Sequence, residues 1–398
     1  MVETTLFFVE NMSYAKSEII INRLQHREDI EKIRQRTLED CITRWGESIH
    51  EDQVKQSLQA LSDNGFDPDL IKPRNGETIS KSITDPAIPK DVSDKIMDKY
   101  SEIINSYSET HENLPDIGAQ SLLSLECPDF AVILMIDDIS VKRQNERRKI
   151  NNKKGYKSAK TVINTVIWLR SKEGLYAITA GDTKEGLKIA LGFMLKNHLL
   201  ENRQLIIFFD GARSIRNNVH EIFSFHKPLK MYLDWYHVCR RISENLSMAL
   251  KCGRENRDKN QDIIKKILSK IWFNKVDDAI AVLQSIDNRI VRQINKIQDS
   301  IDYLENRRPY LYNYASRKIV GLINSSNRVE DMNKQLVATR QKNSGMSWSV
   351  SGSHGLANVT MLTVNGEMHS WISQKSVRFS PRIQPAAFCT HEALPQAV

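Results

Sequence analysis

The chain has 398 residues, a formal net charge of +8 and a sequence pI near 9.1. It is therefore long enough for about two or three domains, and its charge favours a polyanionic partner without requiring one. No apolar run reaches the about 20 residues that a membrane helix needs, and the first residues lack the basic and apolar regions of a signal peptide. The five cysteines include no CxxC pair, which argues against a disulfide framework or a zinc cluster and predicts a reducing, cytoplasmic environment.

Residues 1–120 are strongly polar, and we expect them to be mostly helical. Apolar residues recur at helical spacing over 14–45, and a further helix is predicted over 91–107. Proline-containing segments between these stretches are typical of linkers. The region has too few apolar residues for a large core of its own. It is therefore either an arm that binds nucleic acid or an extension that packs on the rest of the chain.

One short stretch organises the chain that follows. Seven apolar residues run without interruption from Phe130 and then meet Asp137 and Asp138. Such a run is typical of a strand buried on both faces; a helix interior is the alternative, but Pro128 and the β-branched content favour the strand. Acidic residues at the end of this strand would lie at a sheet edge, where open α/β sheets collect ligands. Asp137 is therefore the candidate anchor of a site.

A basic stretch and two further strands come next. Residues 142–160 include nine Lys or Arg and one acidic residue. This stretch is either a solvated loop or a surface that neutralises phosphates. Strands are expected over 161–169 and 175–180, joined by a turn, and a helix over 184–200.

Two later strands also end in acidic residues. The strand Gln204–Phe209 leads into Asp210, and the strand Leu229–Leu233 leads into Asp234 and a helix that reaches Leu250. Each acid has an ordinary interpretation, because Asp-Gly pairs are common in turns and aspartate commonly caps helices. Residues 121–250 are thus expected to form the first part of an α/β core.

Residues 251–320 show heptad-like apolar spacing without a strand signal, and they are expected to form an all-α insertion. The second part of the core is expected over 321–375. It contains a helix over 325–340 that begins with good N-cap residues and carries Glu330, a position that on its own would be a solvated helix residue. Residues 376–398 lack periodicity and are expected to be a disordered tail.

The order β-β-β-α-β-α-β, with acids closing the first and fourth strands, predicts an α/β fold with an RNase H-like mixed sheet, interrupted by the all-α insertion. The third acid in such a core comes from a later helix. Three convergent carboxylates then hold two Mg²⁺ ions roughly 3.5–4 Å apart. One ion activates the attacking oxygen and the other stabilises the leaving 3′ oxygen of a phosphoryl transfer. Mg²⁺ suits such a site because it accepts one or two carboxylates together with substrate phosphate.

The motifs resemble those of bacterial insertion-sequence transposases of the DDE type. The segment Asp137-Asp-Ile-Ser-Val-Lys142 is similar to their D-x-I-x-V-K strand, and Phe209-Asp210-Gly-Ala is similar to their second acidic motif. The segment Ser325-Ser-Asn-Arg-Val-Glu330-Asp-Met-Asn-Lys334 is similar to the helix that carries the third acid. Asp234-Trp-Tyr-His237 resembles the C/D-x-x-H signature of the Mutator-like superfamily, and Ser344-Gly-Met-Ser-Trp348 resembles the stretch after the catalytic helix.

The resemblance covers about residues 125–372. It implies that Asp137, Asp210 and Glu330 are the catalytic residues and the ligands of two Mg²⁺ or Mn²⁺ ions. Asp137 is preferred over Asp138 because it occupies the family position, and because neighbouring strand residues point to opposite faces.

Glu330 is preferred over Asp331 because it stands three residues before Asn333, as the family helix requires. Asp234 and His237 would form the signature motif, although Asp234 is equally compatible with a helix cap and His237 with an ordinary core histidine.

The implied activity is metal-dependent DNA cleavage at terminal inverted repeats, followed by strand transfer into target DNA. A homo-oligomer on paired ends would carry it out in the bacterial cytoplasm, near the nucleoid. The residues expected to contact DNA are Lys142, Arg143, Arg147, Arg148, Lys153, Lys154, Lys157, Arg328, Lys334 and Arg340. The alternatives are a non-catalytic DNA-binding protein derived from a transposase and another RNase H-like nuclease, and the long insertion argues against the nuclease.

Overall fold

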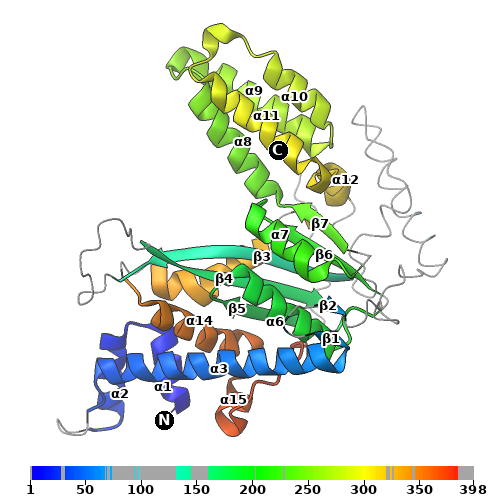
Figure 1. Cartoon of the computed structure of the whole chain (residues 1–398). Helices are drawn as coiled ribbons and strands as arrows, with labels where there is room; N and C mark the ends of the chain where they lie inside the picture. The colour runs from blue at the N-terminus through cyan, green and yellow to red at the C-terminus, as the bar shows by residue number, and fades with distance from the viewer. Residues whose placement is uncertain are drawn as a thin grey trace, which may run out of the picture.

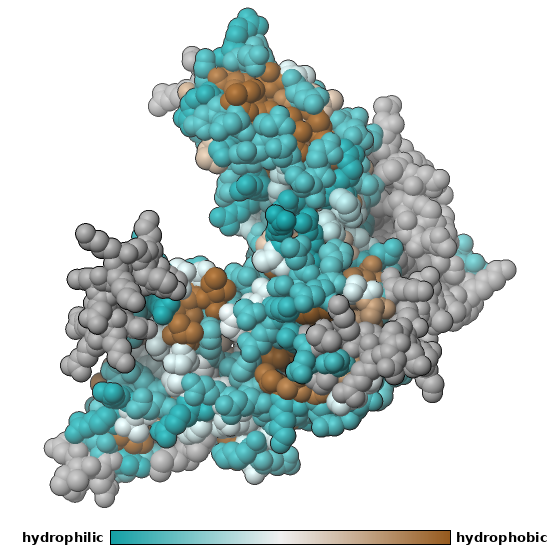
Figure 2. Space-filling model, in the orientation of Figure 1, coloured by the Kyte–Doolittle hydropathy of each residue, from teal (hydrophilic) through white to brown (hydrophobic). Residues whose placement is uncertain are grey.

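The computed structural model describes residues 2–27, 32–67, 69, 72–73, 94, 98, 131–144, 160–201, 203–226, 229–319, 323–324, 327–342 and 346–383. Over these residues the chain is mixed α/β, with a central sheet, a helical unit at one end of it and a layer of helices beneath it (Figure 1). The surface is recessed where the helical unit joins the rest of the molecule, and the narrow middle of the recess is largely hydrophilic (Figure 2). None of the helices in this part of the chain has the length and apolar character to cross a membrane.

The central sheet has five strands in the order β5-β4-β3-β6-β7. Their bounds are β3 Ala131–Lys142, β4 Thr161–Ser171, β5 Gly174–Ala180, β6 Gln204–Phe209 and β7 Leu229–Leu233. β4 pairs antiparallel with both β3 and β5, whereas β6 pairs parallel with both β3 and β7. The sheet is therefore mixed, and β3 joins its antiparallel half to its parallel half.

The central strand β3 is longer than its sequence suggested. Its first six residues and all six residues of β6 are buried, as expected for strands covered on both faces. The antiparallel pairing of β3 with β4 continues to Lys142 opposite Thr161, whereas its parallel pairing with β6 stops at Met135 opposite Phe208. The expectation that Asp137 ends the strand was wrong. Asp137 lies within β3, just beyond the end of its parallel neighbour.

Two helices follow strands of the sheet directly. α6 Thr183–Lys196 begins at Asp182, whose carboxylate accepts hydrogen bonds from the backbone N–H groups of Lys184 and Glu185. α7 Arg213–Phe223 follows β6 and packs against α6. Leu187, Ala190 and Leu191 on α6 are fully buried, so this helix closes one face of the sheet.

The N-terminal helices pack on the core. They are α1 Val2–Asn11, α2 Tyr14–Leu24 and α3 Gln35–Asp63, so the helical periodicity over 14–45 is shared between two helices. α3 lies along α14 and α6, and a Cβ on Gly46 would be 2.2 Å from Cα of Gly355, so α3 and α14 touch backbone to backbone. A short hairpin follows, with β1 Phe66–Asp67 and β2 Lys72–Pro73. The helix predicted over 91–107 lies outside the described residues, except for residues 94 and 98.

The helical unit at the top of Figure 1 contains the predicted insertion, residues 251–320, and also α8, which was predicted as the end of the first part of the core; the whole unit is called the insertion below. Its elements are α8 Trp235–Ala249, α9 Arg254–Trp272, α10 Val276–Gln284, α11 Ile294–Arg307 and α12 Tyr314–Ile319, with short 3-10 turns at Asn288–Ile290 and Arg308–Tyr310. The all-α character predicted for residues 251–320 is confirmed over the described part of that range.

The C-terminal helices depart from expectation in two ways. They are α13 Asn327–Asn333, the π-helix η4 Lys334–Lys342, α14 Val350–Asn365 and α15 Met368–Gln374, so the single helix predicted over 325–340 is a short α-helix continued by a π-helix. The prediction of a disordered tail was wrong for residues 376–383. Phe379 is fully buried against Tyr176 and Phe193, and Arg382 forms a backbone bridge with Leu175. Residues 384–398 lie outside the described residues.

Candidate functional site

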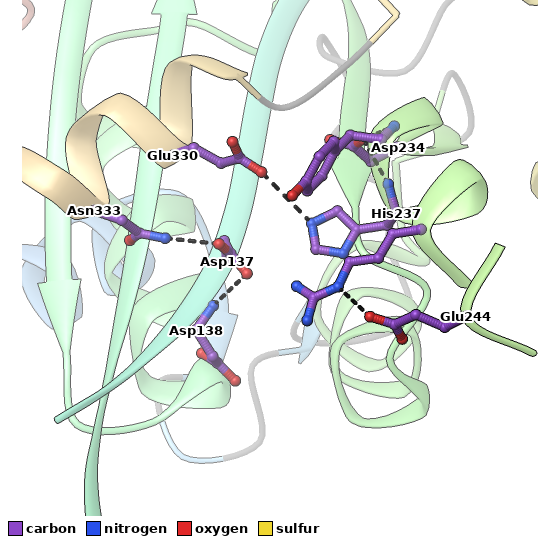
Figure 3. A network of polar contacts seen from close by, with 9 residues as sticks. Asp137, Asp138, Asp234, His237, Glu244, Glu330 and Asn333 are labelled. Carbon is purple, nitrogen blue, oxygen red and sulfur yellow. Dashed lines mark hydrogen bonds and ion pairs between the residues drawn. The ribbon is translucent and has the colours of Figure 1, made fainter. Parts of the chain in front are cut away.

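Asp137 lies where β3 meets α13 (Figure 3). Its Oδ2 accepts a 2.7 Å hydrogen bond from Nδ2 of Asn333, and its Oδ1 accepts a 2.9 Å bond from the backbone N–H of Asp138. Val329 and Asn333 are buried and stand four residues apart, so they occupy the same face of α13. The apolar contact made by Val329 therefore aims the Asn333 amide at the strand.

Asp138 points away from this contact. Its carboxylate accepts hydrogen bonds from the hydroxyl groups of Thr165, at 2.5 Å, and Thr183, at 3.4 Å. Burial raises the pKa of this carboxyl, and the two hydroxyls oppose the rise. The two neighbouring carboxylates thus point to opposite faces of β3, because successive side chains of a strand alternate between the two faces.

Asp210 reaches the site from the end of β6, the parallel neighbour of β3. Its Oδ1 accepts a 2.7 Å hydrogen bond from the backbone N–H of Ala212, and Gly211 between them has a φ of +89°. Glycine adopts this left-handed conformation without strain, so the chain turns sharply into α7. The turn interpretation of Asp210 and Gly211 is therefore correct, and the same turn brings Asp210 close enough for its charge to act on Asp137.

The environment of Asp137 disfavours its negative charge. Burial raises the pKa of this carboxyl to about 6, and the charges of Asp210 and Asp138 push it in the same direction. His237 and the backbone N–H of Asp138 act against the rise. A carboxylate in this position is stabilised by a nearby positive charge, which is the property expected of a cation ligand.

Glu330 faces the insertion across the site. Its Oε1 lies 3.9 Å from Nε2 of His237, whose side chain is 23% exposed (Figure 3). Burial raises the pKa of Glu330, the charge of Asp234 adds to the rise, and His237 opposes it. His237 is therefore not packed in the core, because it is partly exposed and lies beside Glu330.

Asp234 acts through the backbone of α8. It is fully buried, and its carboxylate accepts hydrogen bonds from the backbone N–H groups of Tyr236, at 2.6 Å, and His237, at 3.3 Å. The interpretation of Asp234 as a helix cap is confirmed. Because the cap fixes where α8 begins, it also fixes the direction in which His237 leaves the helix.

The oxygen atoms gathered here suit a hard cation. Asp137 and Asp210 supply carboxylates, and the buried Oδ1 of Asn333 has no hydrogen-bond partner within the described part of the chain. Among the described residues, however, no three His, Cys, Asp or Glu side chains lie close enough together to hold a metal ion. The donor atoms therefore fit Mg²⁺ or Mn²⁺ in kind, while Glu330 is directed toward His237.

Comparison of the whole chain with protein-family models, with curated proteins and with solved structures gives no match. The role of Asn333 was missed from the sequence, where this residue served only to fix the register of the motif. Its place in the S/T-N-x-x-E-x-x-N pattern, one turn after the acid, was the available signal.

The basic residues predicted to contact DNA have different environments. Lys142, Arg328 and Lys334 are exposed, and Arg143 is half-buried beside Trp348. The residues that lie outside the described part of the chain are Arg147, Arg148, Lys153, Lys154 and Lys157.

The prediction that Arg340 contacts DNA was wrong. Its side chain is only 5% exposed, its guanidinium lies against the rings of Tyr14 and Trp348, and its Nε donates a 3.0 Å hydrogen bond to the carbonyl of Val9. Arg340 therefore fastens the N-terminal helices to the end of η4.

Proposed function

We propose that the chain is a DDE transposase with an RNase H-like core, which cleaves DNA at terminal inverted repeats and joins the exposed ends to target DNA. The observation that carries the proposal is the hydrogen bond from Asn333 to Asp137. It brings the helix of the third acidic motif onto the strand of the first, beside Asp210 from the second. The sheet order β5-β4-β3-β6-β7, with β4 antiparallel, supports the same core.

In this proposal Asp137, Asp210 and Glu330 hold two Mg²⁺ or Mn²⁺ ions. Bound there, the ions would supply activation of the attacking oxygen and stabilisation of the leaving 3′ oxygen. Asn333 holds the carboxylate of Asp137 in place. His237 lies 3.9 Å from Glu330 and would give this acid a polar neighbour other than the two aspartates in the absence of the ions.

The proposed partners are DNA duplexes, gripped mainly by their backbones. Lys142 continues the strand that carries Asp137, while Arg328 and Lys334 flank Glu330, and all three are exposed. Cations at these positions would neutralise phosphates on both sides of the acidic site. Cleavage at two transposon ends requires two such sites, so the proposal includes a homo-oligomer assembled on paired ends.

A second candidate is a DNA-binding protein of the same descent that does not cut DNA. It is favoured by the separation of Glu330 from the other acids, since the described residues hold no cluster of three metal-binding side chains. A third candidate, a nuclease for RNA–DNA hybrids, would need neither the insertion nor the contact between His237 and Glu330.

The test uses duplex DNA that carries the inverted repeats flanking the gene, incubated with Mg²⁺ or Mn²⁺. Wild-type protein should nick the repeat ends, whereas Asp210→Asn and Glu330→Gln should bind the same DNA without nicking it. Asp331→Asn is the matched control, because this exposed acid is adjacent to Glu330 but occupies a variable position of the motif, and it should cut as the wild type does. Binding without cutting in all four proteins would select the second candidate, and cutting of hybrids in preference to repeats would select the third.

A further inference from the structure

A pocket of about 260 Å³ opens beside Asp210, between the turn after β6 and helices α8 and α11 of the insertion. Three of its lining residues are arginines, namely Arg240, Arg241 and Arg307, and Tyr303 lies among them. Neither these arginines nor Tyr303 belongs to any of the sequence motifs. The insertion therefore places a basic pocket directly against one of the three proposed catalytic acids.

Two buried hydrogen-bond donors in this pocket have no partner among the described residues. They are the hydroxyl of Tyr303 and Nε of Arg307. Both lie near Gly211: a Cβ there would be 3.5 Å from Nε of Arg307 and 3.9 Å from the hydroxyl of Tyr303. A Cβ at Gly211 would also be 2.8 Å from Cδ1 of Leu233, so a side chain at this position would crowd the space beside the two donors. Buried polar groups normally have partners, so two orphaned donors facing one space indicate a bound acceptor.

The donors are held in place before any ligand arrives. Nη2 of Arg307 donates a 2.7 Å hydrogen bond to the carbonyl of Gly211, and its guanidinium lies 5.2 Å from the centre of the Tyr303 ring. Burial raises the pKa of Tyr303, so its hydroxyl keeps its proton and remains a donor. A rigid, pre-oriented set of donors loses little freedom on binding.

The charges at the pocket favour an anion. Arg240 pairs with Glu244 at 2.8 Å, and Asp210 carries a further negative charge. Arg241 is exposed and makes no ion pair with another described residue, so the charges of Arg241 and Arg307 exceed that of Asp210 by one, and this excess favours an anionic ligand. Guanidinium and hydroxyl donors that converge without an acceptor of their own match the oxygens of a phosphate group.

We propose that this pocket holds a backbone phosphate of the nucleic acid, one that neighbours the phosphate being cleaved, through Arg241, Arg307 and Tyr303. The inference rests on the proposed function, because the position of the pocket beside Asp210 gives it a role only if Asp210 serves phosphoryl transfer. The insertion would then do more than interrupt the core. It would align the DNA strand by its backbone beside Asp210.

The test measures binding of a short duplex of arbitrary sequence in EDTA, so that no cleavage occurs, as a function of salt concentration. Arg241→Gln should weaken binding by about 5- to 10-fold and reduce the slope of log K against log salt by about one. Tyr303→Phe removes one oxygen and no charge, so it should weaken binding by about 3-fold and leave the slope unchanged. Arg292→Gln is the control, because Arg292 is an exposed arginine of the insertion that does not line the pocket.

A duplex series with single methylphosphonate substitutions locates the contact. In the wild type, one position should weaken binding, and in Arg241→Gln the same position should no longer matter. If both pocket variants bind and respond to salt as the wild type does, the inference is overturned while the proposed function stands. If inorganic phosphate raises the melting temperature of the wild type but not of Arg241→Gln while DNA binding is equal in both, the pocket serves a free anion and the inference is also overturned. A wild-type protein that binds no DNA overturns the inference together with the proposed function.

Discussion

Nδ2 of Asn333 on α13 donates a 2.7 Å hydrogen bond to Oδ2 of Asp137 on β3, and the two residues stand 196 positions apart in the chain. The chain between them forms the other four strands of the sheet and the whole insertion before it returns to β3. The contact therefore joins the strand of the first acidic motif to the helix of the third. It also gives a structural role to the asparagine that stands one turn after Glu330 on α13.

Asp137→Asn should stabilise the protein in the absence of metal. The folded-state pKa of about 6 lies above the ordinary aspartate value of 3.8, so in the wild type the free energy of unfolding falls as pH rises from about 4 through 6. Asparagine carries no charge to desolvate, so the variant should be more stable above pH 6 by roughly 2–3 kcal/mol. Urea unfolding in EDTA at pH 4, 5 and 7 measures this difference. A difference that is the same at all three pH values would show that burial of the charge is not its cause.

Asn333→Ala should shift cation binding to higher pH. Loss of the hydrogen bond removes a donor from the charged form of Asp137, so the pKa of this carboxyl should rise further. The midpoint of Mn²⁺ binding against pH should then move up by about half a unit to one unit. Gln335→Ala, at an exposed position two residues along, is the matched control and should leave the midpoint in place. A weaker affinity with an unmoved midpoint would assign Asn333 a purely structural role.

Arg340→Ala should reduce stability without changing the response of DNA binding to salt. The substitution removes the contacts with Tyr14 and Trp348 and the hydrogen bond to Val9, at a cost of about 2–4 kcal/mol. Lys334→Ala, on the same helical segment but exposed, should do the reverse and lower the salt slope by about one. Chemical denaturation and salt titrations on both variants make the comparison, and a lowered slope in Arg340→Ala would reinstate this residue as a DNA contact.

Phe379→Ala should cost about 3–5 kcal/mol of stability, because it empties a fully buried site against the stacked rings of Tyr176 and Phe193. Ile383→Ala, four residues later and 82% exposed, should change stability by less than about 0.5 kcal/mol. Thermal melting of the two variants distinguishes a packed segment from a loose tail, since a loose tail would make the two substitutions equally harmless.

The sequence predicted the elements whose signal is local. The strands Gln204–Phe209 and Leu229–Leu233 were predicted with their observed bounds, because each is a short apolar run that ends in an acid. The length of β3 was missed, although Ile139 and Val141 alternate with polar residues at the period of a strand and both are buried. The unbroken apolar run predicted only the first half of the strand, and the alternating residues after it were not recognised as its continuation.

The features that the sequence did not predict depend on contacts between distant parts of the chain. The sequence predicted Arg340 to be a surface cation. In the structure, its guanidinium is covered by the ring of Tyr14, which belongs to α2. Glu330 was identified by its motif, but its neighbour His237 lies on α8, at the other end of the insertion in the chain. The basic pocket is formed by Arg241 and Arg307, which only the packing of α8 on α11 brings together. No period or spacing in the sequence encodes such pairings.

The π-helix η4 predicts where homologous sequences can differ in length. A π-turn closes through i→i+5 hydrogen bonds and so accommodates one residue more than an α-turn between the same two ends. The segment Lys334–Lys342 separates Asn333, which serves the acidic site, from the buried contacts that Arg340 and Gln341 make near its end. A homologue with an ordinary α-helix here would be one residue shorter and would still satisfy both ends. An alignment of homologues should therefore place a single-residue gap inside Lys334–Lys342 and keep the motif before it in register.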